Sequence, residues 1–279
     1  MATRPLVIKL GGELLEDRAY LATVVASVAT IGKSGTPLVI VHGGGKEIDA
    51  ALKRAGIEKR QVDGLRITDE ATLEVVVTVL AGAINTRLVA ALNAVTVRAV
   101  GLTGADANCG LSDAAAPHQA VDGRTVDLGR VGVPSADADM RLLQTLLREG
   151  FVPVVACIAI GREGQLFNVN ADTLAGHLAG RLGARRLVIA GTTAGVLGDN
   201  GATLPVFEAT AIAELVSRKT ATAGMIAKLR ACEHALGSGV DEVVIVDGRN
   251  QPALVAAATG DAPNTATRIT GSAGMLAKG

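Results

Sequence analysis

The sequence predicts an α/β protein: an open αβα sandwich around a central, mostly parallel sheet, with two lobes in one wound domain. Apolar, β-branched runs alternate with helical patterns along most of the chain, which is typical of a parallel sheet covered on both faces. Glycine-rich turns follow the first two of these runs, as in sheets that bind ligands at the ends of their strands. The 279 residues, 49% of them hydrophobic, can form a core of that size.

Short runs of aliphatic and β-branched residues are expected to form the strands. They are Leu6–Leu10, Leu38–His42, Val97–Leu102, Val152–Ile158, Arg186–Ala190 and Glu242–Val246. Segments with apolar residues at three- and four-residue spacing are expected to form the helices. They are Tyr20–Ile31, Lys46–Ala55, Asp69–Leu92, Met140–Glu149, Thr173–Leu182, Ala211–Leu215 and Gly224–Leu236.

The chain is expected to divide into two lobes that share the sheet. A new series of strands and helices opens at Val152, which places a first lobe at residues 1–150 and a second at residues 151–279. Between Thr103 and Ala138 the chain is rich in glycine, aspartate and alanine, so we expect an irregular or hairpin-like segment there.

The longest helical pattern, Asp69–Leu92, has a clear start and one apolar stripe. Thr68 and Asp69 are both good N-cap residues. The stripe consists of Leu73, Val77, Leu80, Ile84 and Leu88. Such a stripe usually faces the core of the same chain, and a subunit interface is the alternative.

Composition excludes several classes of protein. Lys and Arg together number 27 and so do Asp and Glu, so no overall charge favours nucleic acid or an anionic membrane. With no tryptophan, one tyrosine and three phenylalanines, stacking platforms for single strands are absent. The three cysteines form no C-x-x-C pair, and the four histidines show no metal-ligand spacing. The longest apolar stretch, Phe151–Ile160, is too short for a bilayer and no signal peptide is evident, so we expect a cytoplasmic protein.

Two glycine turns near the start of the chain follow the first two predicted strands. Gly11 and Gly12 come after the first strand, and Gly43–Gly45 come after the second. Because glycine lets the backbone approach an anion and a following helix adds its positive end, each turn suits a phosphate. Lys9 adds a positive charge beside the first turn, so the pair of turns suggests phosphoryl transfer.

A second group of polar residues lies near the start of a helix in the second half of the chain. Asn168 and Asn170 stand on one side of an extended segment, and Asp172 follows them. One interpretation places amide donors and a carboxylate in a site; the other makes Asp172 an N-cap and the asparagines turn residues. Gly224 opens a later helix with Lys228 in its first turns, where a cation opposes the helix dipole. Lys228 is therefore expected to be functional.

Five motifs follow one another along the chain. They are Lys9-Leu10-Gly11-Gly12, His42-Gly43-Gly44-Gly45, Gly64-Leu65-Arg66-Ile67-Thr68-Asp69, Asn168-Val169-Asn170-Ala171-Asp172 and Gly224-Met225-Ile226-Ala227-Lys228. Their order and their residues resemble those of the N-acetylglutamate kinases, within the amino-acid kinase family. The match covers roughly residues 5–250. The resemblance implies an ATP-dependent kinase that phosphorylates the side-chain carboxylate of N-acetyl-L-glutamate, in arginine biosynthesis. Arg66 is the residue that points to this branch of the family.

The resemblance implies a role for each matching residue. Lys9 and Lys228 would flank the transferring phosphoryl group, and Asp172 would hold the two lysines in place. Arg66 would bind the α-carboxylate of the acceptor. The other acceptor contacts would come from Gly44, Gly45, Asn168 and Asn170. The phosphate and nucleotide contacts would come from Gly11, Gly12, Thr192, Thr193, Gly195 and Gly224, with Mg²⁺ carried by ATP.

The sequence departs from the family pattern after the strand Arg186–Ala190, where Thr192 stands in place of the usual aspartate. This departure leaves open a non-catalytic ligand sensor on the same fold. Retention of Lys9, Asp172 and Lys228 favours the enzyme. A kinase for an N-blocked α-aminoadipate, one methylene longer, is a further alternative, because one methylene is worth only about 1–3 kcal/mol of discrimination.

The resemblance also assigns tasks to the two lobes and to subunits. Residues 1–150 would bind the acceptor and form the dimer contact, and residues 151–279 would bind the nucleotide. Relatives with an extra N-terminal helix link dimers into hexamers, and this chain begins only a few residues before its first strand. We therefore expect a homodimer whose contact includes the helix Asp69–Leu92, with a small-molecule substrate and neither nucleic acid nor membrane as a partner.

Overall fold

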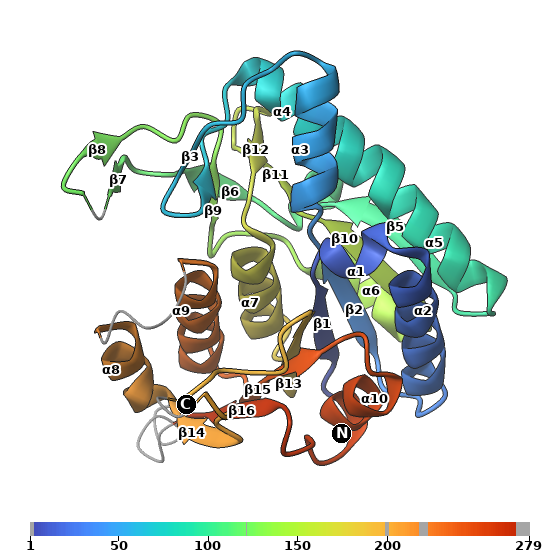
Figure 1. The fold of residues 1–279 in the computed structure, drawn as a ribbon. Helices are drawn as coiled ribbons and strands as arrows, with labels where there is room; N and C mark the ends of the chain where they lie inside the picture. The colour runs from blue at the N-terminus through green and yellow to red at the C-terminus, as the bar shows by residue number, and fades with distance from the viewer. Residues whose placement is uncertain (1–2, 121, 199–200, 218–222, 272–279) are drawn as a thin grey trace.

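The computed structural model describes residues 3–120, 122–198, 201–217 and 223–271. Within these residues, one eight-stranded sheet forms the centre of the molecule, with helices on both faces (Figure 1). From edge to edge its strands are β14 (Val206–Glu208), β16 (Thr267–Thr270), β15 (Glu242–Asp247), β13 (Arg186–Gly191), β1 (Leu6–Leu10), β2 (Leu38–His42), β10 (Val152–Ala156) and β5 (Ala99–Thr103). Neighbours run parallel except β15 and β16. The predicted αβα sandwich with a mostly parallel sheet is confirmed.

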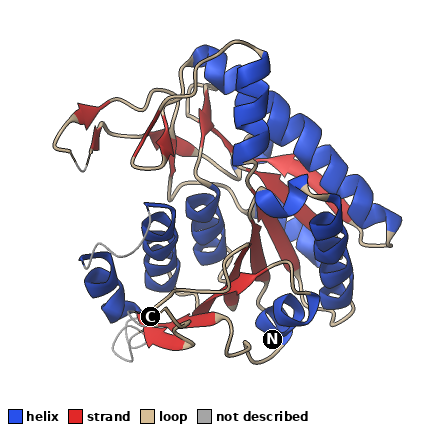
Figure 2. Cartoon of the chain, in the orientation of Figure 1, coloured by secondary structure: helices blue, strands red, loops and turns tan. Residues whose placement is uncertain are grey.

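The helices divide between the two faces of the sheet, as the cartoon in Figure 2 shows. On one face α7 (Ala171–Arg181) and α9 (Ala223–Gly237) pack together, and on the other lie α2 (Arg18–Gly32), α5 (Asn85–Ala94) and α10 (Gln251–Thr259). The other α-helices are α1 (Glu13–Glu16), α3 (Gly45–Arg54), α4 (Glu70–Val77), α6 (Arg141–Arg148) and α8 (Ile212–Ser217). A π-helix, η1 (Thr78–Ile84), joins α4 to α5, and η2 (Asp106–Asn108) and η3 (Ala209–Ala211) are 3₁₀ turns.

Short antiparallel strand pairs lie together at the upper end of the molecule in Figure 1. They are β3 (Gln61–Val62) with β4 (Leu65–Arg66), β6 (Ser112–Ala114) with β9 (Gly132–Pro134), β7 (His118–Gln119) with β8 (Thr125–Val126), and β11 (Ile158–Ile160) with β12 (Leu166–Asn168). Val62, Ala120 and Leu128 form a small separate core among them. Two of these pairs fall between Thr103 and Ala138, so the hairpin-like segment expected there is confirmed.

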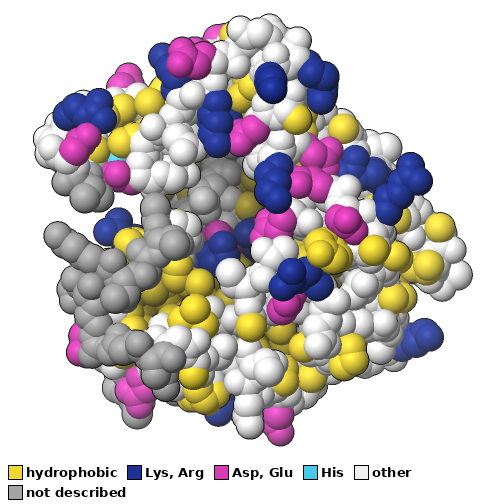
Figure 3. All heavy atoms as spheres, in the orientation of Figure 1, with side chains coloured by type: hydrophobic (Ala, Val, Ile, Leu, Met, Phe, Trp, Pro, Cys, Tyr) yellow, Lys and Arg dark blue, Asp and Glu magenta, His cyan; other side chains and the backbone are white. Residues whose placement is uncertain are grey.

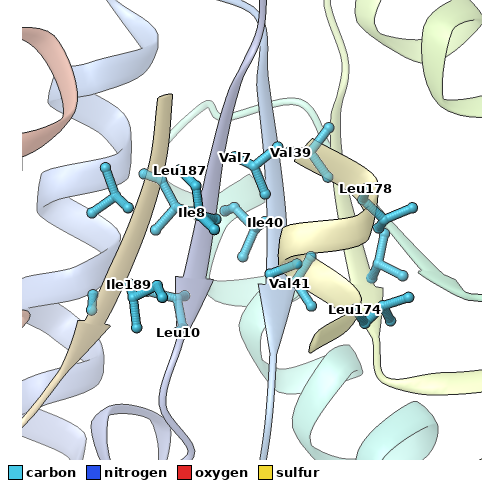
Figure 4. Packing of buried hydrophobic residues seen from close by; sticks show 14 of the residues in the cluster. Val7, Ile8, Leu10, Val39, Ile40, Val41, Leu174, Leu178, Leu187 and Ile189 are labelled. Atoms are coloured by element: carbon cyan, nitrogen blue, oxygen red, sulfur yellow. The ribbon is translucent and has the colours of Figure 1, made fainter. Parts of the chain in front are cut away.

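The central strands β1, β2 and β13 are buried along their whole length. In parallel register, Lys9 of β1 lies beside Val41 of β2. Figure 4 shows Val41 on the side of β2 that faces Leu174 of α7. Because side chains alternate along a strand, Lys9 points toward α7, and His42, the last residue of β2, points toward the opposite face.

The predicted strands are present, most with ends shifted by a residue or two. One of them, Val152–Ile158, divides at Cys157 into β10 and β11, so the chain leaves the sheet for a hairpin. The sequence pattern does not predict α10, whose alanine-rich run has no distinct apolar stripe, or the short edge strands β14 and β16. Although β10 follows residue 150, it lies between β2 and β5 and so belongs to the first half of the sheet.

The predicted helix Asp69–Leu92 is confirmed as one continuous helical stretch, Glu70–Ala94, with η1 inside it. Asp69 caps it by accepting a 2.9 Å hydrogen bond from the Thr72 amide. Among the described residues, this is the one helix long and apolar enough to cross a membrane by length and composition.

The apolar composition of this helix has a structural cause within one chain. Leu80, Ile84 and Leu88 are at most 1% exposed and pack into the main core. Val76 lies on the buried side in place of the predicted Val77, which is half-buried. The stripe is therefore that of a core helix.

Candidate active site

The two glycine turns lie side by side at the ends of β1 and β2. The strands are parallel neighbours, and the Gly43 amide donates a 3.1 Å hydrogen bond to the Leu10 carbonyl. A Cβ atom added to Gly12 would lie 2.6 Å from the Cα of Gly44, so this approach requires glycine. The Gly11 amide donates to a carbonyl at the end of β13 at 2.9 Å, which joins a third strand end to the pair. The two turns therefore meet at one end of the sheet.

Lys9, Asp172 and Lys228 come together from β1, α7 and α9. The Lys9 Nζ lies 3.0 Å from Asp172 Oδ1, and the Lys228 Nζ lies 3.8 Å from Asp172 Oδ2. Lys9 and Asp172 are buried, whereas the Lys228 side chain is 20% exposed. Burial by itself would lower the pKa of Lys9, but the Asp172 carboxylate outweighs this effect and raises the pKa above its ordinary value. Lys9 therefore stays charged at neutral pH.

Arg66 reaches from β4 back to the start of α3. Its Nη2 pairs with Asp49 and donates to the Gly45 carbonyl at 3.4 Å. Its Nη1 is buried without a hydrogen-bond partner among the described residues. A buried guanidinium nitrogen without a partner, next to a glycine turn, suits a carboxylate ligand.

The two asparagines of the second-half motif have different surroundings. Asn168, at the end of β12, donates from Nδ2 to the Thr68 hydroxyl at 3.2 Å. Asn170 is the N-cap of α7, and its Oδ1 accepts from the amides of Asp172 and Thr173 at 2.9 and 3.1 Å. The alternative that made Asp172 the N-cap is wrong. Because Asn170 caps the helix, the Asp172 carboxylate can pair with the lysines.

Thr192 and Thr193 follow β13, next to the strand that ends at the first glycine turn. The Thr192 carbonyl accepts a 3.0 Å hydrogen bond from the Arg249 guanidinium, which also pairs with Asp247. The structure thus brings the two threonines to the same edge of the sheet as Gly11.

Gly195 and Gly224 lie in different environments. A Cβ atom at Gly195 would be 2.4 Å from the Thr267 hydroxyl of β16, so this glycine is required by close packing of the loop. Gly224 is exposed in the first turn of α9 and has open space around it. Nucleotide contacts by either residue stay a prediction.

Two residues near the site are ones to which the sequence assigned no role in it. Thr68 looks like a helix cap, yet it is fully buried and accepts the hydrogen bond from Asn168. Asn85 lies within the apolar stripe of the long helix, between Ile84 and Leu88, and contacts His42 next to the second glycine turn. A polar residue within a buried stripe is the signal that could have identified Asn85.

The donors gathered here suit an anion. Figure 3 shows the face of the molecule hollowed between its upper and lower parts, with both basic and acidic side chains in the hollow. Two ammonium groups and glycine amides match phosphate oxygens, whereas Mg²⁺ takes oxygen ligands and does not fit this set. No group of three His, Cys, Asp or Glu side chains in the described part of the chain could hold a metal ion.

Comparison with known sequences places the chain among kinases. A family profile described as "Amino acid kinase family" matches residues 4–247. An acetylglutamate kinase from Sphingopyxis alaskensis is 42% identical over 259 residues, covering 91% of this chain and 85% of that protein. An acetylglutamate kinase from Methylobacterium nodulans is 41% identical over 248 residues, covering 87% of this chain and 81% of that protein.

Solved structures agree on the fold. The protein smu.665 from Streptococcus mutans UA159 has a TM-score of 0.78 at 26% identity, over 95% of this chain and 98% of that chain. N-acetylglutamate synthase from Neisseria gonorrhoeae has a TM-score of 0.81 at 24% identity, over 97% of this chain and 60% of that chain, and shows the fold alone. With two glycine turns, a lysine–aspartate–lysine group and these relatives, the chain belongs to the amino acid kinase family.

Proposed function

We propose that this protein transfers the γ-phosphoryl group of ATP to the side-chain carboxylate of N-acetyl-L-glutamate, forming N-acetylglutamyl phosphate for arginine biosynthesis. The observation that carries the proposal is the ion-paired group of Lys9, Asp172 and Lys228 at two touching glycine turns. The choice of acceptor is supported by relatives named acetylglutamate kinase at 42% and 41% identity.

The chemistry needs positioning and charge stabilisation more than proton transfer. The acceptor carboxylate is already a nucleophile, so no general base is required. Lys9 and Lys228 would offset negative charge on the transferring phosphoryl group, to which Gly11, Gly12 and Gly44 would donate amide hydrogen bonds. Asp172 holds both ammonium groups at 3.0 and 3.8 Å, so they need little reorganisation as charge develops.

Arg66 is proposed to bind the α-carboxylate of the acceptor through its unpartnered Nη1. Gly45 lies next to it, since its carbonyl accepts from the same guanidinium. Asn168 would bind the acetamido group or main-chain part of the acceptor. Asn170 uses its Oδ1 to cap α7, which leaves its Nδ2 as the group to offer a substrate.

ATP is proposed to bind along the ends of β1 and β13 and the start of α9, through Thr192, Thr193, Gly195 and Gly224. Mg²⁺ would arrive on the ATP phosphates, where it neutralises part of their charge. The protein's own donors hold the phosphate oxygens. The usual aspartate of the family is replaced by Thr192, whose carbonyl Arg249 holds.

We propose that the two lobes bind different substrates, as the sequence suggests. The exception is one segment of the second half, which lies on the acceptor side. Residues 1–150 supply most of the acceptor site and residues 151–279 supply the nucleotide site. Residues 152–168 follow the boundary, yet β10 lies between β2 and β5, and the β11–β12 pair carries Asn168 to Thr68.

A cytoplasmic homodimer is proposed, with the helix Glu70–Ala94 in its contact. In the most apolar stretch of this helix 39% of the residues are buried within one chain, and the exposed positions of the helix include Ala83 and Ala90. The neighbouring β5 is an edge strand. A second copy on this face would cover these alanines and the half-buried Val75 and Val77. Cys109, Cys157 and Cys232 are buried free thiols, as expected in a reducing compartment.

The test is an assay that traps acyl phosphate as hydroxamate, with ATP and Mg²⁺. N-acetylglutamate, N-acetyl-α-aminoadipate, glutamate, aspartate and carbamate are compared in parallel at equal concentration. We expect N-acetylglutamate to give the highest kcat/KM. A preference for the aminoadipate derivative would overturn the acceptor assignment, and no hydroxamate from any of the five would overturn the kinase and favour a ligand sensor.

A further inference from the structure

Asn85 is a buried polar residue in the long helix Glu70–Ala94, directly after the π-helix η1, and it is 5% exposed. Its Nδ2 donates to the Val154 carbonyl of β10 at 2.9 Å and lies 3.1 Å from the His42 Nε2 of β2. On β5, a Cβ atom at Gly101 would lie 2.1 Å from Asn85 Oδ1, so this glycine leaves room for the amide. The Asn85 side chain is thus confined by three adjacent strands.

His42 connects Asn85 to the second glycine turn. The histidine is fully buried at the end of β2, and its Nδ1 lies 3.2 Å from the Gly43 carbonyl. Because Nε2 accepts from Asn85, the ring proton resides on Nδ1 and is donated to Gly43. Burial lowers the pKa of His42 to about 4, so the imidazole is neutral at physiological pH. The Nδ1–H tautomer of His42 is therefore fixed by a hydrogen bond at each ring nitrogen.

The same helical segment also packs on the turn directly. A Cβ atom at Gly44 would lie 2.2 Å from the Ile84 Cδ1 and 2.9 Å from the Leu80 Cδ2. Leu80 and Ile84 belong to η1, and Asn85 comes next, so all three buried residues lie against β2 or its turn. A π-helical turn departs from the α-helical register and often marks a functional site.

We propose that Asn85 is a positioning residue for phosphoryl transfer, which acts through His42 to fix the backbone of Gly43–Gly45. The inference rests on the proposed function, which assigns this turn to the acceptor and the transferring phosphoryl group. Asn85 lies behind the turn and acts only through His42. An error of about 1 Å in such a turn can cost about 100-fold in rate.

The first test measures the His42 tautomer in the wild-type protein without substrate. The ring nitrogens are labelled with ¹⁵N, and the His42 signals, among four histidines, are identified by their loss in His42→Leu. We expect the Nδ1–H tautomer, unchanged between about pH 6 and 8 because the ring does not titrate there. The Nε2–H tautomer, or a ring that titrates in this range, would overturn the proposal.

The second test compares two leucine substitutions on the same helix. Asn85→Leu removes the hydrogen bonds to His42 and Val154. The control is Asn93→Leu, which removes two 3.1 Å hydrogen bonds to the backbone of Ala99, away from the glycine turns. We expect Asn85→Leu to lower kcat/KM for the acceptor about 10- to 100-fold with KM for ATP unchanged, while Asn93→Leu changes only the melting temperature.

A double variant separates positioning from general destabilisation. If Asn85 acts through His42, the Asn85→Leu/His42→Leu protein loses no more kcat/KM than the worse of the two single variants. Additive losses, or a folded Asn85→Leu protein with wild-type kcat/KM, would overturn the inference. Should Asn85→Leu fail to fold, the tautomer of the wild-type protein decides. Absence of activity with every acceptor overturns the proposed function instead, since the tautomer measurement needs no substrate.

Discussion

Lys9 carries a positive charge in the core because Asp172 lies 3.0 Å away and a second lysine, Lys228, approaches the same carboxylate. Buried charges of this kind are costly unless they are paired, and perturbed ionisable groups concentrate at functional sites. Two positively charged lysines share one negatively charged carboxylate. An incoming phosphoryl group would bring further negative charge to the two ammonium groups. At the residue scale, the site is therefore built for an anion.

We expect Lys9→Ala and Lys228→Ala each to lower kcat by about 100-fold, because each removes a cation from the transferring phosphoryl group. Lys228→Ala is the cleaner variant, since its side chain is 20% exposed and its loss leaves the Lys9–Asp172 pair intact. The measurement is hydroxamate formation at saturating ATP and acceptor. Lys53→Ala, at an exposed position of α3, is the control. Wild-type kcat in either active-site variant would refute the mechanism.

The buried histidines predict how stability depends on pH. Burial lowers the pKa of His42 and His177 to about 4, below the ordinary value near 6.5. Since the unfolded chain binds more protons between these values, the free energy of unfolding falls as the pH falls from about 7 to 4. The expected loss by pH 5 is about 2 kcal/mol for each histidine. Denaturant unfolding at several pH values should show a smaller loss in His177→Leu than in wild type, and an equal loss would contradict this account.

At the scale of elements, the π-helix η1 and the second glycine turn form one packed unit. The φ of Gly44 is −178°, so glycine is required at this position by close approach and not by a left-handed conformation. Leu80 and Ile84 fill the space that a Cβ atom would need. The turn proposed to contact the acceptor is therefore supported by the same helix that we propose for the dimer contact.

We expect Gly44→Ala to reduce both stability and activity, because the new methyl group would overlap Ile84 at 2.2 Å. Overpacking of this kind costs about 1–3 kcal/mol of unfolding free energy. Gly82→Ala is the matched control within η1, since open space surrounds Gly82 and alanine favours helix by about 1 kcal/mol. Thermal unfolding and kcat/KM for the acceptor are the readouts. Equal behaviour of the two variants would show that the turn tolerates a side chain.

At the scale of the whole molecule, the sheet places the two proposed substrate sites on opposite sides of one central strand. β1 lies between β2, which leads to the acceptor turn, and β13, which leads to the proposed nucleotide loop. α7 and α9 then bring Asp172 and Lys228 over the end of β1. The proposed line of transfer therefore crosses the middle of the sheet, where the strands are buried along their whole length.

We expect a mass in solution of twice the 28.2 kDa chain, because the outer face of the helix Glu70–Ala94 carries small exposed residues such as Ala83 and Ala90 on which a second copy would pack. Ala90→Arg, at an exposed position of this helix, should give a monomer, since it places a charge in the contact. Ala213→Arg, exposed on α8, should leave the dimer intact. Light scattering of the three proteins provides the measurement. A monomeric or hexameric wild-type protein would exclude this dimer.

Local sequence patterns could predict the central strands, the long helix and the residues that carry charge. The resemblance of five motifs to the N-acetylglutamate kinases implied that Lys9, Asp172 and Lys228 form one group, and the structure brings them together. Short elements such as β14, β16 and α10 could not be predicted, because their burial comes from neighbours distant in the sequence. The role of Asp172 was ambiguous for the same reason, since it could cap a helix by sequence, whereas in the fold Asn170 is the cap and Asp172 pairs with lysine.

What the sequence by itself determined is the periodicity of its elements and the chemistry available at their ends: two glycine turns after apolar strands, and lysines where helix or strand packing gains nothing from them. Only the tertiary structure decided which ends meet, because parallel pairing joins β1 to β2 and β13 across long stretches of chain. It also decided that the long helix packs against the second glycine turn. The placement of Asn85 behind His42, and of Leu80 and Ile84 against Gly44, depends on three-dimensional packing that no local pattern encodes.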